Sequence, residues 1–187
     1  MSPGSHLVLS WLVAEVDGAL PRRDRFWITM AGISPDADGV GLVAGLACGS
    51  WDLAQQWYAA WHHALGHNLV AAVVVAVAIG AWCRSWRTGV LALVTFHLHL
   101  VCDVIGSRGP DGYQWPIPYL NPFSAWGWTW DGQWHLNAWQ NTVITAIALV
   151  ISVILALRRG RWLTDLVSVR WDAAVVEVLR RRLGRRG

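Results

Sequence analysis

Long apolar segments constrain this chain more than any other feature, because they approach the length that a helix needs to cross a bilayer. That length is about 20 apolar residues, within a range of about 17 to 25. Residues 67–83, 89–106 and 138–157 come near it, and two shorter apolar stretches, 7–20 and 26–34, precede them. The sequence therefore predicts an all-α, multi-pass membrane helical bundle, with three long spans and a short N-terminal helical hairpin.

The composition agrees with a membrane protein and separates a basic tail from the rest. Hydrophobic residues make up 55% of the chain and charged residues 14%, against about 25% charged residues in a soluble domain. Nine of the 15 basic residues follow residue 157. We predict a membrane-embedded domain, residues 1–157, and a cytoplasmic tail, residues 158–187. The tail should form an amphipathic surface helix, with Trp162 and Trp171 toward lipid and arginines on lipid headgroups rather than on nucleic acid.

The placement of arginine predicts an orientation in a bacterial-type inner membrane. Short loops rich in arginine stay on the cytoplasmic side. Arg84 and Arg87 lie between the first two long segments, and Arg158 and Arg159 follow the third. The C-terminus is therefore expected in the cytoplasm, and residues 107–137 outside. If the "PRRDR" turn is also cytoplasmic, the polar residues scattered through the N-terminal half gather on the outer side.

Two ionisable residues inside the second long segment are the strongest sign of function. His99 and Asp103 are four residues apart, so a helix would place them on one face with Cβ atoms about 5 to 6 Å apart. They could offer a nitrogen and an oxygen to the same cation. An ionisable residue within a span is unfavourable by roughly 2.5 to 3.5 kcal/mol on insertion scales and is read as functional by default. A structural hydrogen bond between the two side chains is the alternative.

Two further motifs could supply ligands to the same site. In "WHHALGHN", His63 and His67 would share a helical face, whereas His62 and His67 converge only if a helix begins between them. Interfacial histidines at a membrane boundary are the alternative interpretation. In "SPDADG", Asp36 and Asp38 flank an alanine in an expected turn, where carboxylates can bind a cation or orient a histidine ligand.

The order of these motifs resembles the YdjM-like family of inner-membrane metal-dependent hydrolases, over residues 5 to about 125. An early histidine, His6, precedes P-D-x-D, then H-x4-H, then H-x3-D inside a helix, and finally a segment rich in Pro and Trp. The family commonly reads H-R-G-x-T-H-S where this chain has "HHALGHN". The family pattern therefore selects His62 as the ligand, whereas helical spacing selects His63. The resemblance implies metal-dependent hydrolysis.

Imidazole and carboxylate ligands, without a thiolate pattern, suit a divalent hydrolytic metal. Zinc is the first choice, with manganese or iron as alternatives, and the number of candidates allows one or two ions. The candidate metal ligands are His6, Asp36, His62, His63, His67, His99 and Asp103. Asp38 is the predicted general base, and Arg108 is a candidate contact to a phosphate.

The segment 106–140 and the outward site together predict the substrate class. The tryptophans of this segment should form an aromatic belt at headgroup level, or a lid that grips an amphipathic substrate. Membrane lipids are the expected partners, and a phosphoester of a lipid or lipid-linked molecule is the expected substrate. The alternatives are a metal or proton transporter and a non-catalytic scaffold. A transporter would need polar residues through the full bundle, whereas "VVVAVAIG" and "ALVISVILAL" are apolar.

Overall fold

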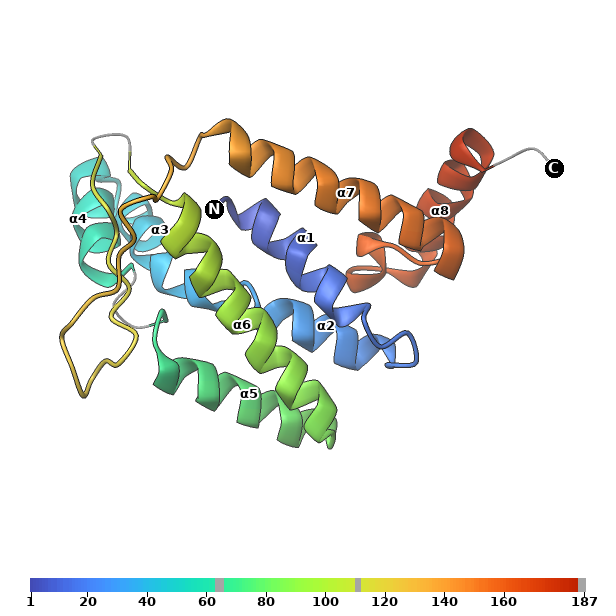
Figure 1. Ribbon diagram of the computed structural model, residues 1–187, viewed down its shortest axis with the longest axis horizontal. Coiled ribbons are helices and arrows are strands. Elements are labelled where there is room, and N and C mark those ends of the chain that lie inside the picture. Colours follow the sequence, from blue (N-terminus) through green and yellow to red (C-terminus); the bar gives the residue numbers. More distant parts are fainter. Residues whose placement is uncertain (63–65, 110–111, 185–187) are drawn as a thin grey trace.

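The computed structural model describes residues 1–62, 66–109 and 112–184, and the secondary-structure elements in those residues are all helices, with no β-strand (Figure 1). In chain order the helices are α1 Pro3–Ala14, α2 Arg22–Ala31, the 3-10 helix η1 Ser34–Gly39, α3 Val40–Ala47, α4 Trp51–Trp61, α5 Leu69–Cys83, α6 Trp86–Gly106, α7 Trp139–Arg159, the 3-10 helix η2 Leu163–Leu166 and α8 Val169–Leu183. The all-α prediction is confirmed.

Helix α6 is the centre of the bundle. Helix α5 packs along one side of it, the α1–α2 hairpin packs along another, and α7 lies against α1 (Figure 1). Apolar side chains such as Ala72 and Phe96 fill the α5–α6 contact. The α3–α4 hairpin and the long connection between α6 and α7 gather at one end of the bundle, and α8 lies at the other (Figure 1).

Two helices, α6 and α7, are long and apolar enough to cross a membrane, each with 21 residues. Helix α5 has only 15, because the side chain of Asn68 caps its first turn and Arg84 ends it in a left-handed conformation with φ of 53°. Fifteen residues rise about 22 Å, well short of the roughly 30 Å of a hydrocarbon core. The prediction of a third long span at residues 67–83 is therefore wrong.

The N-terminal hairpin is confirmed, and both of its helices begin four residues before the apolar stretches that predicted them. Ser2 caps α1 by accepting a hydrogen bond from the Ser5 amide, and Pro21 precedes α2. A second hairpin, α3–α4, was not predicted. Its helices approach so closely that a Cβ at Gly45 would lie 2.3 Å from the backbone nitrogen of Ala54, which makes glycine necessary there.

Ion pairs join the α1–α2 turn to the start of the tail at the end of the bundle where α8 lies. The carboxylate of Glu15 is fully buried and lies 3.0 Å from Arg25, 2.8 Å from Arg159 and 3.0 Å from Arg161. Arg25 also pairs with Asp165. The arginine-rich turn after α1 therefore lies next to the arginines after α7. We call these five residues the arginine–glutamate network.

The tail folds as a surface helix with a mixed environment. Trp171 and Val178 on α8 are exposed, as expected of residues that face lipid. Trp162 differs, because its indole nitrogen donates a hydrogen bond to Ser152 of α7 at 2.8 Å. The prediction that Trp162 faces lipid is therefore wrong, and this side chain fastens the tail to the bundle.

Candidate metal centre

His99 and Asp103 lie on one face of α6, near the end of the helix that is remote from Arg84. His99 Nε2 is 3.0 Å from Asp103 Oδ2, and both residues are buried. The predicted four-residue pairing is thus confirmed. His99 Nδ1 donates a hydrogen bond to the carbonyl of Gly32 at 2.8 Å. Since Nδ1 carries the proton of that bond, Nε2 is the ring atom that faces Asp103, and it makes no hydrogen bond within the described chain.

His67 approaches Asp103 from the connection between α4 and α5. Its Nε2 lies 3.5 Å from Asp103 Oδ2, and its Nδ1 lies 3.0 Å from Asp38 Oδ2. A carboxylate that holds the outer nitrogen of a histidine is the usual support of a metal ligand. The approach requires Gly66, because a Cβ there would lie 2.4 Å from the carbonyl oxygen of Pro35. The Gly66 amide also donates to Asp38 Oδ2 at 3.0 Å.

The two carboxylates of η1 have different surroundings. Asp38 is buried and connects two imidazoles, since its Oδ1 also lies 3.0 Å from His62 Nδ1. Asp36 is partly open to solvent, and its Oδ1 lies 3.5 Å from His99 Nε2. Its Oδ2 has no hydrogen-bond partner among the described residues. The expected turn is a 3-10 helix, and it directs both carboxylates into the cluster.

His6 completes the cluster from α1. Its Nε2 lies 3.2 Å from Asp103 Oδ1, and its ring stacks on His99 with 3.7 Å between ring centroids. The α-amino nitrogen of Met1 lies 2.5 Å from the same Asp103 oxygen. One ligand atom from each of Asp36, His67, His99 and Asp103 can be chosen so that all four lie within 4.8 Å of one another, and the same holds for Asp38, His62 and His67.

The charges of the loop residues follow from these contacts. Burial raises the pKa of Asp38, but hydrogen bonds from His62 and His67 outweigh burial and hold that pKa well below its ordinary value. Burial lowers the pKa of His67, and the carboxylates of Asp103 and Asp38 more than reverse this, so that its pKa stands above the ordinary value. Before an ion binds, the cluster thus favours carboxylates balanced by protonated imidazole. A divalent cation would compete with that proton.

A cavity of about 260 Å³ opens beside the cluster and reaches Asp36, Asp103, His62, Tyr58 and Trp115. The Tyr58 ring stacks on His62 with 4.4 Å between centroids. Burial and the nearby carboxylates raise the pKa of Tyr58 to about 12, so its hydroxyl stays protonated. Sequence analysis missed Tyr58, although its position four residues before His62 was a usable signal.

The structure brings most of the predicted site residues together, in one cluster. These are His6, Asp36, Asp38, His62, His67, His99 and Asp103. His63 lies outside the described residues. His67 lies in the connection between α4, which ends at Trp61, and α5, which begins at Leu69. Arg108 is directed elsewhere: its guanidinium donates to the carbonyl of Asp131 at 3.3 Å, and it does not line the cavity. The catalytic and ligand roles themselves stay predictions.

The fold and the cluster define an α-helical protein with two candidate spans and a buried group of histidines and carboxylates. A family model described as YdjM inner membrane protein matches residues 1–179. The chain therefore belongs to this family of inner membrane proteins, as the motif order suggested. Searches of curated proteins and of solved structures found no match.

Proposed function

We propose that this protein is a membrane-embedded, metal-dependent hydrolase that holds one zinc ion with His67, His99 and Asp103. The observation that carries the proposal is His99 Nε2. This nitrogen is buried, makes no hydrogen bond within the part of the chain described, and belongs to a ring whose other nitrogen is fixed by Gly32. An unsatisfied buried polar group is unfavourable by about 1 to 3 kcal/mol. Coordination of a cation would remove that penalty.

The ligand set fits a catalytic rather than a structural zinc site. Catalytic zinc has three protein ligands and one open position, and manganese or iron accept the same donors. The supports are the Gly32 carbonyl behind His99 and the Asp38 carboxylate behind His67. A second ion at Asp38, His62 and His67 would share His67 with the first, and both imidazoles there are already hydrogen-bonded to Asp38. The geometry therefore favours a single ion.

The proposal changes the role expected for Asp38. Its oxygens already accept hydrogen bonds from His62, His67 and the Gly66 amide, so Asp38 positions these groups. Asp36 is the better proton acceptor, because its Oδ2 has no partner among described residues and its side chain lines the cavity.

A bound ion would supply Lewis acidity and lower the pKa of water. Next to it, the Asp36 carboxylate would take up the proton released by water. The protonated hydroxyl of Tyr58 lines the same cavity and would donate a hydrogen bond to a substrate oxygen. A cavity of about 260 Å³ suits a phosphoester headgroup rather than a whole lipid. We therefore propose the phosphoester of a lipid or lipid-linked molecule as the substrate.

The distribution of charge supports an outward-facing site. The arginine–glutamate network and Arg84 lie toward one end of the bundle, and Arg23 donates to the carbonyl of Cys83 at that end. The positive-inside tendency assigns this end to the cytoplasm. Asp103 lies near the opposite end of α6, so the cluster would open at the outer leaflet.

The interior of the bundle gives little support to transport. Thr29, Thr88 and Thr95 are buried hydroxyls between the two ends, which the apolar pattern did not predict. Thr29 and Thr95 donate to backbone carbonyls nearby, and Thr88 donates to Asp24. These bonds hold helices together and use the hydroxyl protons that an ion or proton pathway would need.

The test is hydrolysis of lipid by the purified full-length protein. Zinc-loaded protein is reconstituted with phosphatidylethanolamine and phosphatidylglycerol, and released headgroups are measured by mass spectrometry. We expect product from wild type and from His135→Ala, and none from His99→Ala or after chelation. His135 is the control histidine, because it is exposed, lines neither cavity, and its Nδ1 bonds to the Gly109 carbonyl. Product formation that survives both His99→Ala and chelation would refute the proposal.

A further inference from the structure

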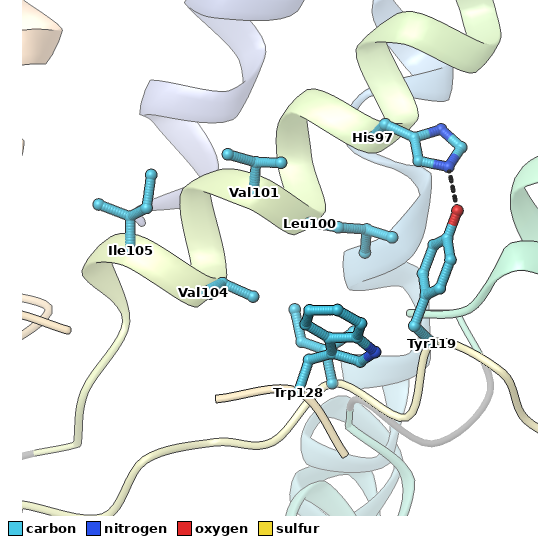
Figure 2. Close-up of a pocket in the computed structure, with 8 residues that line it drawn as sticks. His97, Leu100, Val101, Val104, Ile105, Tyr119 and Trp128 are labelled. Carbon is cyan, nitrogen blue, oxygen red and sulfur yellow. Dashed lines mark hydrogen bonds between the residues drawn. The ribbon is translucent and has the colours of Figure 1, made fainter. Parts of the chain in front are cut away.

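An apolar groove runs along a second face of α6, beside the face that carries His99 and Asp103. Its volume is about 320 Å³. Figure 2 shows Val104 and Leu100 of α6 on one wall, with Trp128 and Tyr119 of the long connection facing them. The groove is lined by His97, Leu100, Val101, Val104, Ile105, Ile117, Tyr119 and Trp128.

The polar groups in this groove are satisfied by each other. His97 Nε2 lies 2.9 Å from the Tyr119 hydroxyl (Figure 2). His97 Nδ1 lies 2.8 Å from the Leu93 carbonyl oxygen. The remaining lining side chains are aliphatic or aromatic. Apolar surface on a ligand would therefore contribute favourable binding free energy in this groove, whereas a charged group would contribute none.

The groove adjoins the cavity of the candidate metal centre. Val104 follows Asp103 directly on α6, so a single turn of helix presents one residue to each space. The facing chain segment does the same, since Trp115 lines the cavity and Ile117 lines the groove. Two backbone hydrogen bonds between Ile117 and Trp128, of 3.0 and 2.8 Å, hold this wall in place.

The depth of the groove matches one leaflet. Helix α6 is a candidate span by its length and composition, and in a bilayer this face would border hydrocarbon. From His97 to Ile105 the helix rises about 12 Å, and half of a hydrocarbon core is about 15 Å. The His97–Tyr119 pair closes the end nearer the middle of the span.

We propose that this groove holds one acyl chain of a lipid whose headgroup lies in the cavity beside Asp103. The proposal rests on the proposed hydrolase and narrows its substrate to a membrane lipid with a straight hydrocarbon chain. It excludes a water-soluble phosphoester as the preferred substrate. The long connection then has a definite role, because Ile117, Tyr119 and Trp128 form one wall of the chain site.

The experiment is photo-crosslinking with the full-length, zinc-loaded protein in nanodiscs. The probe is phosphatidylglycerol with a diazirine in one acyl chain, diluted into phosphatidylethanolamine and phosphatidylglycerol. Crosslinked residues are mapped by mass spectrometry. We expect crosslinks concentrated on residues 97–105 and 117–128, well above the exposed residues Ile147 and Val150 of α7, which report ordinary surrounding lipid.

A matched pair of variants tests occupancy. Val104→Trp fills the groove, whereas Val94→Trp makes the same change at a lipid-exposed position of α6 outside it. Displacing even two methylene groups from apolar contact weakens binding by about tenfold. We therefore expect a loss of groove crosslinks of about tenfold in Val104→Trp and none in Val94→Trp. Should Val104→Trp fail to fold, the wild-type crosslink map decides alone.

The same samples separate this proposal from the hydrolase. Metal content is measured in each, and Val104→Trp should keep its metal. Bound metal with crosslinks spread evenly over α6 and α7 would overturn the chain site alone. Groove crosslinks in a protein that binds no metal would overturn the hydrolase and leave the chain site standing.

Discussion

The two ends of the bundle bury charge in opposite ways. At the arginine end, both carboxylate oxygens of Glu15 face guanidinium groups from Arg25, Arg159 and Arg161. At the other end, His99 Nε2 and Asp36 Oδ2 make no hydrogen bond to any described residue. Both carboxylate oxygens of Glu15 are therefore paired, whereas the second cluster keeps two buried atoms without a hydrogen bond among the described residues. This difference is the reason for proposing a cation at the second cluster and none at the first.

The largest expected effect is on metal content, and it distinguishes His99 from His97 on the same helix. His99→Ala removes one of three proposed ligands, and removing even a supporting residue weakens metal binding about 10- to 100-fold. We expect His99→Ala to lose its metal on purification and His97→Ala to keep it. Elemental analysis of the purified variants measures this. Equal metal content in the two variants would contradict the claim that only the face of α6 with His99 binds metal.

The next effect is on stability: a substitution in the arginine–glutamate network should destabilise the protein and leave its metal content unchanged. Glu15→Gln leaves Arg25 buried with a reduced set of ion-pair partners, and breaking a buried pair is destabilising by about 3 to 5 kcal/mol. Glu177→Gln removes an exposed pair with Arg181, where about 0.3 to 0.5 kcal/mol is expected. Unfolding in detergent measures both. Loss of metal from a folded Glu15→Gln protein would contradict the independence of the two ends.

A smaller effect tests the support behind His67. Asp38→Asn keeps the shape but weakens the acceptor that holds His67 Nδ1, so metal affinity should fall about 10- to 100-fold without vanishing. Asp52→Asn, an exposed position on α4, is the control and should leave affinity unchanged. Competition with a chelating indicator gives both values. Complete loss of metal binding in Asp38→Asn would indicate that Asp38 is itself a ligand. Unchanged metal affinity would contradict its positioning role.

The smallest effect is on pH. Because the pKa of His67 stands above its ordinary value before an ion binds, its ring keeps a proton to higher pH than a free imidazole does, and metal must displace that proton. Metal affinity should therefore fall as pH decreases, by about tenfold per unit for each proton displaced. His97→Ala should show the same slope. Affinity that stays constant between pH 7.5 and 5.5 would contradict protonation of the cluster.

Local geometry explains which parts of the site the sequence could predict. The pairing of His99 with Asp103 depends only on helical spacing, so the residue numbers were sufficient. The positions of His62 and His67 depend on the connection between α4 and α5 and on its contact with η1 through Gly66. Such contacts between distant segments leave no periodic signal, so the sequence alone could not place His62 and His67 against Asp38.

The fold shows the same division. The α1–α2 hairpin and α7 were predictable because long apolar stretches and arginine-rich boundaries are visible in the sequence. Hydropathy overestimated the third span because it counts apolar residues and does not detect the cap at Asn68. Helix α3 was missed because it is short and apolar on all sides, so it has no amphipathic period. Arg108 could not be placed, because the direction of the chain after α6 is set by contacts with the long connection.

The central claim is that a cation satisfies the buried nitrogens and carboxylates around Asp103. X-ray absorption at the zinc edge, on wild-type protein loaded with zinc and freed of excess metal, tests it most directly. The account predicts about one zinc per chain, with histidine nitrogen and carboxylate oxygen ligands at about 2.0 to 2.2 Å and no sulfur. A protein that retains no zinc, or zinc bound through sulfur, would contradict it.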